Sequence, residues 1–329
     1  MGIGSSYIGI SGWRYAPWRG VFYPRRLPQH RELEYASREF RSIELNGSFY
    51  SLQTPDSYAR WYEDTPEGFV FAIKGSRYIT HILRLRDARQ ALCNFYASGL
   101  FNLREKMGPF LWQIPPTFKY DRERLARFFD LLPRDTAAAL ALARRRDSRL
   151  RGRARLAIDA NRPLRHALEV RHPSFVDASF VELLREHRIA LVVADTAGKW
   201  PYLEDLTADF LYLRLHGDQE LYASGYTPAA LDRWADRIRA WLRGSQPTDA
   251  STAAARSSAP PAPSRDVYCY FDNDRKVHAP FDAHALHARL SGMPVTRVRG
   301  RRRSRPSDLV ADVRNFLRRG FGSARNATR

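Results

Sequence analysis

The chain has 329 residues, 44% of them apolar, so it can bury a sizeable core as two average domains or one large α/β barrel. Its two cysteines, Cys93 and Cys269, exclude a disulfide framework or a cysteine metal cluster and favour a reducing, cytoplasmic location. No apolar run reaches membrane-spanning length, so we expect no membrane partner.

The net charge of +19 is concentrated in two segments. Residues 134–165 hold ten Arg and three Asp, and residues 291–329 hold eleven Arg and two Asp, so these segments carry 16 of the 19 net charges. The rest of the chain is nearly neutral. We therefore expect any nonspecific affinity for nucleic acid to reside in these two segments, through contacts with the phosphate backbone.

Eight segments of the chain read as strands with an apolar face. In chain order they are expected at residues 7–11, 42–46, 69–75, 110–116, 166–175, 189–195, 209–217 and 267–274. The sixth is a nearly continuous apolar run, typical of a parallel strand buried on both faces. Apolar spacing and capping residues predict helices between them, at residues 29–40, 54–61, 87–107, 121–131, 176–187, 227–241 and 282–290.

This alternation predicts a TIM-like (β/α)8 barrel formed by residues 1–290. Residues 134–165 read as an Arg-rich insertion after the fourth strand. Residues 244–265, rich in Ala, Ser and Pro, read as a flexible, disordered linker before the eighth strand. Residues 291–329 read as a basic C-terminal tail. A doubly wound open sheet is the weaker alternative, because no glycine-rich phosphate loop follows any strand.

The loop after the first strand carries five aromatic residues, among them Trp13 and Tyr15. Two interpretations stay open for this loop. Its rings either form a lid or stacking surface for a ligand, or pack on neighbouring helices.

Seven stretches of the sequence resemble the YecE-like family, the domain of unknown function numbered 72. They are YIGISGWRYAPWRGVFYP, SIELNGSFYSL, FVFAIKGSRYITH, GPFLWQIPP, LEVRHPSF, ADFLYLRLHG and YCYFDND. The resemblance implies a TIM-like barrel and, as the family's name states, no settled activity. The Arg-rich insertion, the linker and the basic tail are not part of the family pattern.

Function in a barrel of this kind lies where the strands end. Alternation sends these polar residues inward at the carboxyl ends: Ser11, Glu44, Asn46, Lys74, Gln113, Glu169, Arg171, Asp195, Arg214, His216 and Asp272. For any single residue a structural salt bridge is the better interpretation. For the whole set we favour a ligand site, because burying this many charges is unfavourable and barrel interiors are usually filled by branched aliphatic residues.

Three activities compete for this site. A metal-dependent sugar isomerase or phosphodiester hydrolase would use Glu169, Asp195, His216 and Asp272 as ligands, although the neighbouring arginines would repel the ion. A metal-free glycosidase would use the carboxylates of Glu44 and Glu169. The third activity is binding of a phosphate or carboxylate in a clamp of cationic side chains.

We favour the third activity, in which the mouth of the barrel, at the carboxyl ends of its strands, binds a phosphorylated sugar or nucleotide-like anion. If the protein is a hydrolase or isomerase, it processes this ligand by metal-free acid/base chemistry. Catalysis is then assigned to Glu169, His216, Glu44 and Asp272. Ligand binding is assigned to Lys74, Arg171, Arg214, Asn46, Gln113, Trp13, Tyr15 and Asp195. No cofactor is predicted, although a divalent metal stays open. The non-enzyme alternative is a nucleic-acid binding module that recognises an end or a flipped base.

Overall fold

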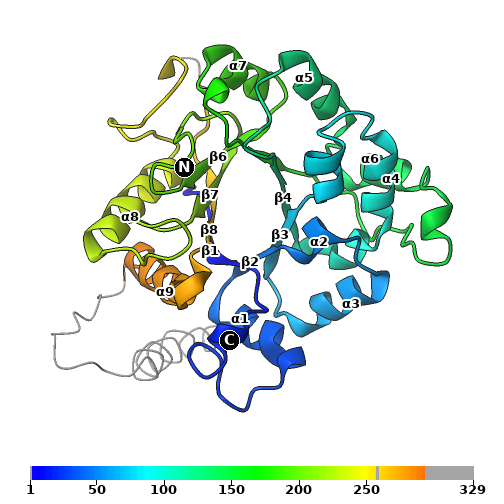
Figure 1. Cartoon of the computed structure of the whole chain (residues 1–329), viewed down its shortest axis with the longest axis horizontal. Coiled ribbons are helices and arrows are strands. Elements are labelled where there is room, and N and C mark those ends of the chain that lie inside the picture. Colours follow the sequence, from blue (N-terminus) through cyan, green and yellow to red (C-terminus); the bar gives the residue numbers. More distant parts are fainter. Residues whose placement is uncertain (1, 257–258, 293–329) are drawn as a thin grey trace, which may run out of the picture.

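The computed structural model describes residues 2–256 and 259–292, in which eight parallel strands close into a barrel (Figure 1). The strands pair in chain order, and β1 pairs with β8 to close the ring. The TIM-like barrel expected from the sequence is therefore confirmed. The strands are β1 (Ser6–Ser11), β2 (Ser42–Leu45), β3 (Val70–Lys74), β4 (Met107–Gln113), β5 (His166–Glu169), β6 (Ala190–Asp195), β7 (Phe210–Leu215) and β8 (Asp266–Phe271).

Helices surround the barrel (Figure 1). They are α1 (Glu32–Glu39), α2 (Gly47–Tyr50), α3 (Pro55–Asp64), α4 (Arg89–Ala97), α5 (Arg122–Leu131), α6 (Thr136–Ala143), α7 (Ala178–Glu186), α8 (Pro228–Leu242) and α9 (His278–Leu290). Two of them begin with the caps that the sequence predicts, because Thr54 Oγ1 and Thr227 Oγ1 each accept a backbone N–H at 3.2 Å. No helix in the described part of the chain combines the length and apolar character needed to cross a bilayer.

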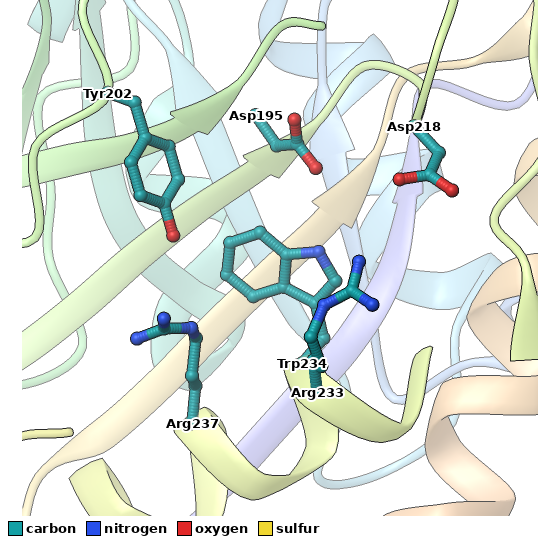
Figure 2. Close-up of a pocket in the computed structure, with 6 residues that line it drawn as sticks. All are labelled: Asp195, Tyr202, Asp218, Arg233, Trp234 and Arg237. Atoms are coloured by element: carbon teal, nitrogen blue, oxygen red, sulfur yellow. The ribbon is translucent and has the colours of Figure 1, made fainter. Parts of the chain in front are cut away.

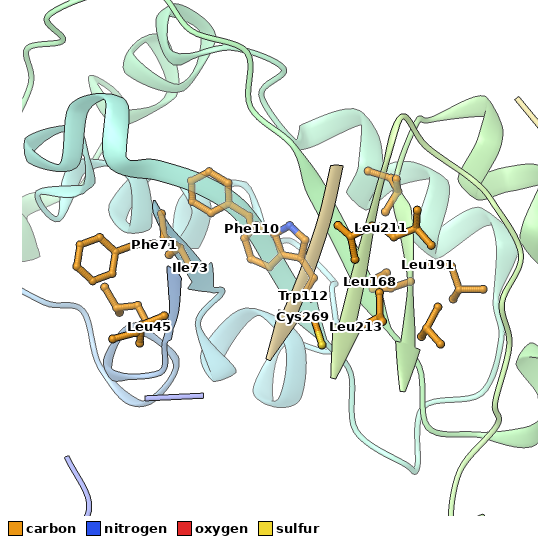
Figure 3. Packing of buried hydrophobic residues seen from close by; sticks show 14 of the residues in the cluster. Leu45, Phe71, Ile73, Phe110, Trp112, Leu168, Leu191, Leu211, Leu213 and Cys269 are labelled. Atoms are coloured by element: carbon orange, nitrogen blue, oxygen red, sulfur yellow. The ribbon is translucent and has the colours of Figure 1, made fainter. Parts of the chain in front are cut away.

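Alternation along the strands divides the core into an outer and an inner cluster. Outward residues such as Leu211 and Leu213 pack in the large cluster that contains the helices' apolar residues (Figure 3). Inward residues such as Ala72, Val192 and Tyr212 form the smaller cluster inside the barrel. The two cysteines are buried and unpaired. The polar residues at the strand ends therefore lie above an apolar interior.

The helix expected over residues 87–107 is interrupted. Helix α4 ends at Ala97, and a 3-10 helix (Leu100–Lys106) follows Gly99, whose φ is +122°. A Cβ at Gly99 would lie 2.6 Å from the Cα of Pro55, so the chain needs glycine to pass the start of α3. This break depends on a tertiary contact, which helical periodicity does not reveal.

The Arg-rich insertion is a helical excursion packed on α4. Helix α6 forms its first part, and its last part returns beside the start of α6, where Thr136 N donates to Arg162 O at 2.9 Å. The turn that follows α6 lies next to the start of α4, because Gln90 Nε2 donates to Arg145 O at 3.2 Å. The basic tail lies outside the described residues from residue 293 onward.

The segment expected to be a flexible linker is instead held against the barrel over residues 244–256. The carboxylate of Asp205 accepts the N–H groups of Ala253 and Ala254 at 2.9 and 3.0 Å, and Glu204 Oε2 accepts Ser251 N at 2.9 Å. In Figure 1 this yellow segment lies between α7 and α8, where the β6–β7 connection contains no helix. The expectation of a free linker is wrong here, because composition does not show that buried acids elsewhere hold its backbone.

Asp205→Ala should lower the free energy of unfolding by about 2–3 kcal/mol, because it removes the charged acceptor of two backbone N–H groups. Asp249→Ala is the control, since its carboxylate is 74% exposed and should contribute less than about 1 kcal/mol. Urea denaturation measures both values. Equal and small effects would contradict the packed arrangement of residues 244–256.

Candidate functional site

The centre of the mouth is a buried ion network around Arg214 of β7, whose side chain is 1% exposed. Its Nε and Nη2 donate to Glu44 at 3.0 and 2.9 Å. Its Nη1 donates to Glu169 at 2.8 Å, and its Nη2 also donates to Asp272 at 2.8 Å. One guanidinium thus joins carboxylates from β2, from β5 and from the residue after β8.

Further donors complete the hydrogen bonding of the two glutamates in this network. Glu44 accepts from Ser11 Oγ and from the Tyr212 hydroxyl, both at 2.7 Å. Glu169 accepts from Arg171 Nε at 2.6 Å. A buried charge network of this kind is stable only when its members are paired and hydrogen-bonded. It therefore holds the ends of several strands in one arrangement.

The network keeps the carboxylates of Glu169 and Asp272 ionised. Burial would raise the pKa of Glu169, but Arg171 and Arg214 outweigh it, so the pKa lies well below its usual value. Burial likewise opposes ionisation of Asp272, and Arg214 and His216 more than offset it, so this pKa is also lowered. A carboxylate with a lowered pKa is a poor proton donor at neutral pH. These two acids are thus better suited to holding the arginines than to general acid catalysis.

His216 is enclosed beside the network. Its Nδ1 lies 3.1 Å from Asp272 Oδ2, and the rings of Trp200 and Tyr222 meet it edge-on. Burial and the charge of Arg214 lower the pKa of His216. Its imidazole is therefore mostly neutral at pH 7.

Lys74, at the end of β3, lies at the mouth without an ion-pair partner among the described residues. Its Nζ is 4.5 Å from the centre of the Phe49 ring, and the side chain is buried. Burial and the charge of Arg214 lower the pKa of Lys74 to about 8, although the three carboxylates act in the opposite direction. Lys74 is thus a buried cation whose charge is not directly compensated.

His81 and Arg171 lie near Lys74. Burial, followed by the charges of Lys74 and Arg171, lowers the pKa of His81 to about 4, so its ring is neutral at pH 7. Its Nε2 lies 3.5 Å from Gln113 Nε2. The guanidinium of Arg171 lies over the ring of Trp200, 3.9 Å from its centre. Two cations, an imidazole and an amide therefore share one part of the mouth.

Among the described residues, some polar atoms at the mouth are buried without a hydrogen-bond partner. They include Asn46 Oδ1, Asp274 Oδ1 and His216 Nε2. Burial, with the charge of Asp272, raises the pKa of Asp274 well above its usual value, and the Tyr15 hydroxyl lies beside it. Unsatisfied buried atoms in a native structure call for a bonding partner, which a ligand or an ordered water can supply.

Most of the residues that the sequence analysis assigned to the site lie together at this mouth. They are Glu44, Asn46, Lys74, Gln113, Glu169, Arg171, Arg214, His216, Asp272 and Tyr15, whose hydroxyl donates to Ser11 O at 2.5 Å. The structure gives Arg214 a different setting from the one expected. Each of its three guanidinium nitrogens donates to a protein oxygen, so Arg214 holds the strand ends together rather than facing a ligand.

Asp195 was expected inside the mouth, and this is wrong. Val192 and Ala194 belong to the cluster inside the barrel, so Asp195 faces outward and accepts from the Tyr226 hydroxyl at 3.0 Å. The four residues Glu169, Asp195, His216 and Asp272 therefore do not converge as metal ligands. Within the described ranges, no group of three or more His, Cys, Asp or Glu is arranged to hold a metal ion.

Trp13 also lies away from the mouth, because its ring packs edge-on against Trp61 of α3 at 5.5 Å. Trp18, Phe22 and Tyr23 of the same loop are almost fully buried. The packing interpretation of the aromatic loop therefore holds for these rings, whereas Tyr15 reaches the mouth.

Four residues at the mouth were not assigned from the sequence: His81, Trp200, Tyr222 and Asp274. All lie beyond the strand ends, in loops or short helical turns, where strand alternation no longer gives a side chain's direction. The signal that could have found them is position alone, since polar and aromatic residues in loops after barrel strands often line the site.

Comparisons with known proteins agree with the barrel. A family model described as "Protein of unknown function DUF72" matches residues 7–304. The UPF0759 protein YunF of Bacillus subtilis is 28% identical over 125 residues, and the UPF0759 protein YecE of Escherichia coli K12 is 31% identical over 128 residues. These alignments cover 36% and 39% of this chain and 43% and 44% of the relatives, so the chain spans less than half the length of either.

Two solved structures share the fold. A DUF72 family protein (TM1631) from Thermotoga maritima is 24% identical with a TM-score of 0.62, covering 88% of this chain and 98% of that one. A DUF72 family protein (EF0366) from Enterococcus faecalis is 15% identical with a TM-score of 0.61, covering 87% and 95%. At these identities the likeness supports the fold alone.

Lys74→Met should raise the free energy of unfolding at pH 7, by up to about 3 kcal/mol, because the charged ammonium is unfavourable in the folded state. The folded pKa is about 8 and the unfolded value about 10.5, so the unfolded chain binds more protons between these values. Stability of the natural protein should therefore rise with pH across this window. Lys74→Met should lack that rise.

Urea denaturation between pH 7 and pH 10.5 tests this, with the exposed Lys119→Met as control. A Lys74→Met protein that is less stable at pH 7 and keeps the full pH dependence would contradict the prediction, because it would show that Lys74 stabilises the folded state.

Proposed function

The chain belongs to the family of proteins of unknown function DUF72, and we propose that its barrel mouth binds a small phosphorylated sugar or nucleotide-like anion through Lys74 and Arg171. The observation that carries this proposal is the buried ammonium of Lys74, which has no ion-pair partner among the described residues. An uncompensated buried charge is costly, often by several kcal/mol. A bound anion would supply the missing partner.

Arg171 is positioned to assist Lys74. Its Nε and Nη2 bind Glu169, and Trp200 covers its guanidinium plane, which fixes the direction of the remaining nitrogen. Charge-assisted bonds from a fixed guanidinium suit phosphate and carboxylate groups. The unsatisfied Oδ1 of Asn46 would accept a ligand hydroxyl.

Acid/base chemistry at this site would use groups outside the ion network. Asp274 keeps its proton to a higher pH than an ordinary carboxyl, because burial and the charge of Asp272 raise its pKa, so it is suited to donate a proton. His81 is neutral at pH 7, but its pKa of about 4 makes it a weak base, so it is better suited to accept a hydrogen bond from a ligand hydroxyl. A hydrolase or isomerase acting without a metal would use Asp274 as its proton donor.

Lys74→Met should weaken binding of a hexose phosphate or a nucleoside monophosphate by roughly 10- to 100-fold, because one charge-assisted bond is lost. In the natural protein, affinity should fall as the pH rises through about 8, where Lys74 loses its proton. Lys74→Arg should retain binding at pH 9, because the guanidinium stays charged.

Isothermal titration calorimetry with these two ligands, inorganic phosphate and the unphosphorylated hexose measures the effects. Equal affinity for the hexose and its phosphate, or unchanged affinity in folded Lys74→Met, would reject the proposal.

A second candidate function, binding of single-stranded nucleic acid at the rim of the mouth, is favoured by the position of the basic insertion. The turn after α6 is attached to α4 by Asn94, whose Nδ2 donates to Asp147 Oδ2 at 3.0 Å. Arg149 of this turn interacts with Tyr78, which is 45% exposed in the loop that follows β3. Exposed aromatic rings beside arginines are the groups that stack bases and hold phosphates.

Replacing Arg144, Arg145 and Arg151 by serine should weaken binding of a short oligothymidylate and reduce its salt slope by about 2, since each lost phosphate contact removes about 0.7. Tyr78→Ala should weaken binding about fivefold or more without changing the slope, because stacking releases no counterions. Fluorescence anisotropy at several salt concentrations separates the two effects.

The matched control removes three exposed arginines from α1, α3 and α5: Arg38, Arg60 and Arg127. If the control lowers the affinity and the salt slope as much as the insertion variant does, binding depends only on the net charge of the protein and not on the position of the insertion.

A further inference from the structure

A cavity of about 240 Å³ lies outside the mouth (Figure 2). It is formed by the end of β6 and the connection after it, the loop after β7, and α8. Its walls are Asp195, Tyr202, Asp218, Arg233, Trp234 and Arg237. None of the residues that surround Lys74 lines it.

Two of these side chains face the cavity with bonding capacity left. The guanidinium of Arg233 forms no hydrogen bond or ion pair with the described residues. Asp218 accepts one long contact, from Thr227 Oγ1 at 3.4 Å. Figure 2 shows the carboxylate and the guanidinium on the same side of the cavity, and they form no ion pair with each other. A ligand between them could accept from one and donate to the other.

The other charged groups of this cavity are already bound. Arg237 donates to Glu204 at 2.9 Å and to Asp249 at 2.7 Å. Asp195 accepts from the Tyr226 hydroxyl at 3.0 Å, and the indole of Trp234 also donates to its carboxylate. These groups form rigid walls and leave Asp218 and Arg233 as the adaptable contacts.

The remaining wall is aromatic. The rings of Tyr202 and Trp234 lie 6.4 Å apart at an angle of 69° and form a corner. A corner of this shape offers an apolar surface to the C–H face of a small ring. The volume is below the roughly 300–1,000 Å³ of cavities that hold drug-sized ligands, so it suits a single ring.

We propose that this cavity binds a small neutral polyol of monosaccharide size, as a site separate from the anion site at the mouth. Adjacent hydroxyl groups can donate to Asp218 and accept from Arg233 at the same time. A simple anion would meet the carboxylates of Asp195 and Asp218, and a simple cation would meet Arg233, so a neutral ligand is preferred. The end of β7 separates the two sites, because His216 N donates to Asp195 O at 2.9 Å and Tyr226 accepts Gly217 N at 3.2 Å.

Binding is tested with the full chain by saturation-transfer NMR and calorimetry, using glucose, galactose, xylose and inositol as polyols, with glycine and inorganic phosphate for comparison. At least one polyol should bind, and Asp218→Asn and Arg233→Gln should each weaken it about tenfold or more. Asp236→Asn, which alters a carboxylate that is 77% exposed on α8, is the control and should change nothing. Lys74→Met should leave polyol binding unchanged, which separates this site from the mouth.

Absence of polyol binding by the natural protein would overturn the proposal. So would polyol binding that survives both variants while their circular dichroism matches the natural protein. The proposal would also be overturned if glycine binds more strongly than any polyol and its binding depends on Asp218 and Arg233, because the cavity would then be a site for a zwitterion.

Discussion

The pairing of Arg214 with three carboxylates is the interaction on which the mouth depends. Glu44, Glu169 and Asp272 come from different parts of the barrel, and the guanidinium holds all three within 3.0 Å of its nitrogens. In a water-poor interior, both the attraction and the penalty for losing a partner are larger than at the surface. With Arg171 the network has two positive and three negative groups, and the ammonium of Lys74 lies nearby without an ion pair to any described residue.

This arrangement explains which residues of the mouth are structural and which are free to act. The carboxylates that would be attractive as catalytic acids bind arginines, and the ionised forms of Glu169 and Asp272 are stabilised. The groups that remain are Lys74, one nitrogen of Arg171, His81, Asn46 and Asp274. They lie around the network, which holds Arg171 through Glu169 and Asn46 through Ser11. The cationic cluster at the mouth is thus built next to the ion pairs that hold the strand ends together.

The sequence predicts the barrel well, because strand alternation has a period of two and each strand carries one clear apolar face. The same alternation predicts that Glu44, Lys74, Glu169 and Arg214 meet at one end. The alternation fails for Asp195, because the run IALVVAD is apolar on both faces and does not show which face points into the barrel. It also does not show which residues each side chain will bind. Arg214 was expected to bind a ligand, but the positions of three carboxylates from other strands decide that it does not.

Features that depend on contacts far apart in the chain are missed for the same reason. Residues 244–256 look like a free linker by composition and are held by two acids from residues 204 and 205. Trp13 looks like a ligand platform and packs against Trp61. Local pattern sets the direction of a side chain in a strand, whereas tertiary packing decides what it meets.

The pKa of Lys74, measured by NMR titration of isotope-labelled lysine side chains, tests the proposed anion site most directly. The chain has only five lysines, and Lys74→Arg assigns the signal. We predict a pKa of about 8 in the ligand-free protein, because burial and Arg214 destabilise the ammonium, and an increase when a phosphate-bearing ligand binds. A pKa near 10.5 in the free protein, or a value that stays the same in the complex, would contradict it.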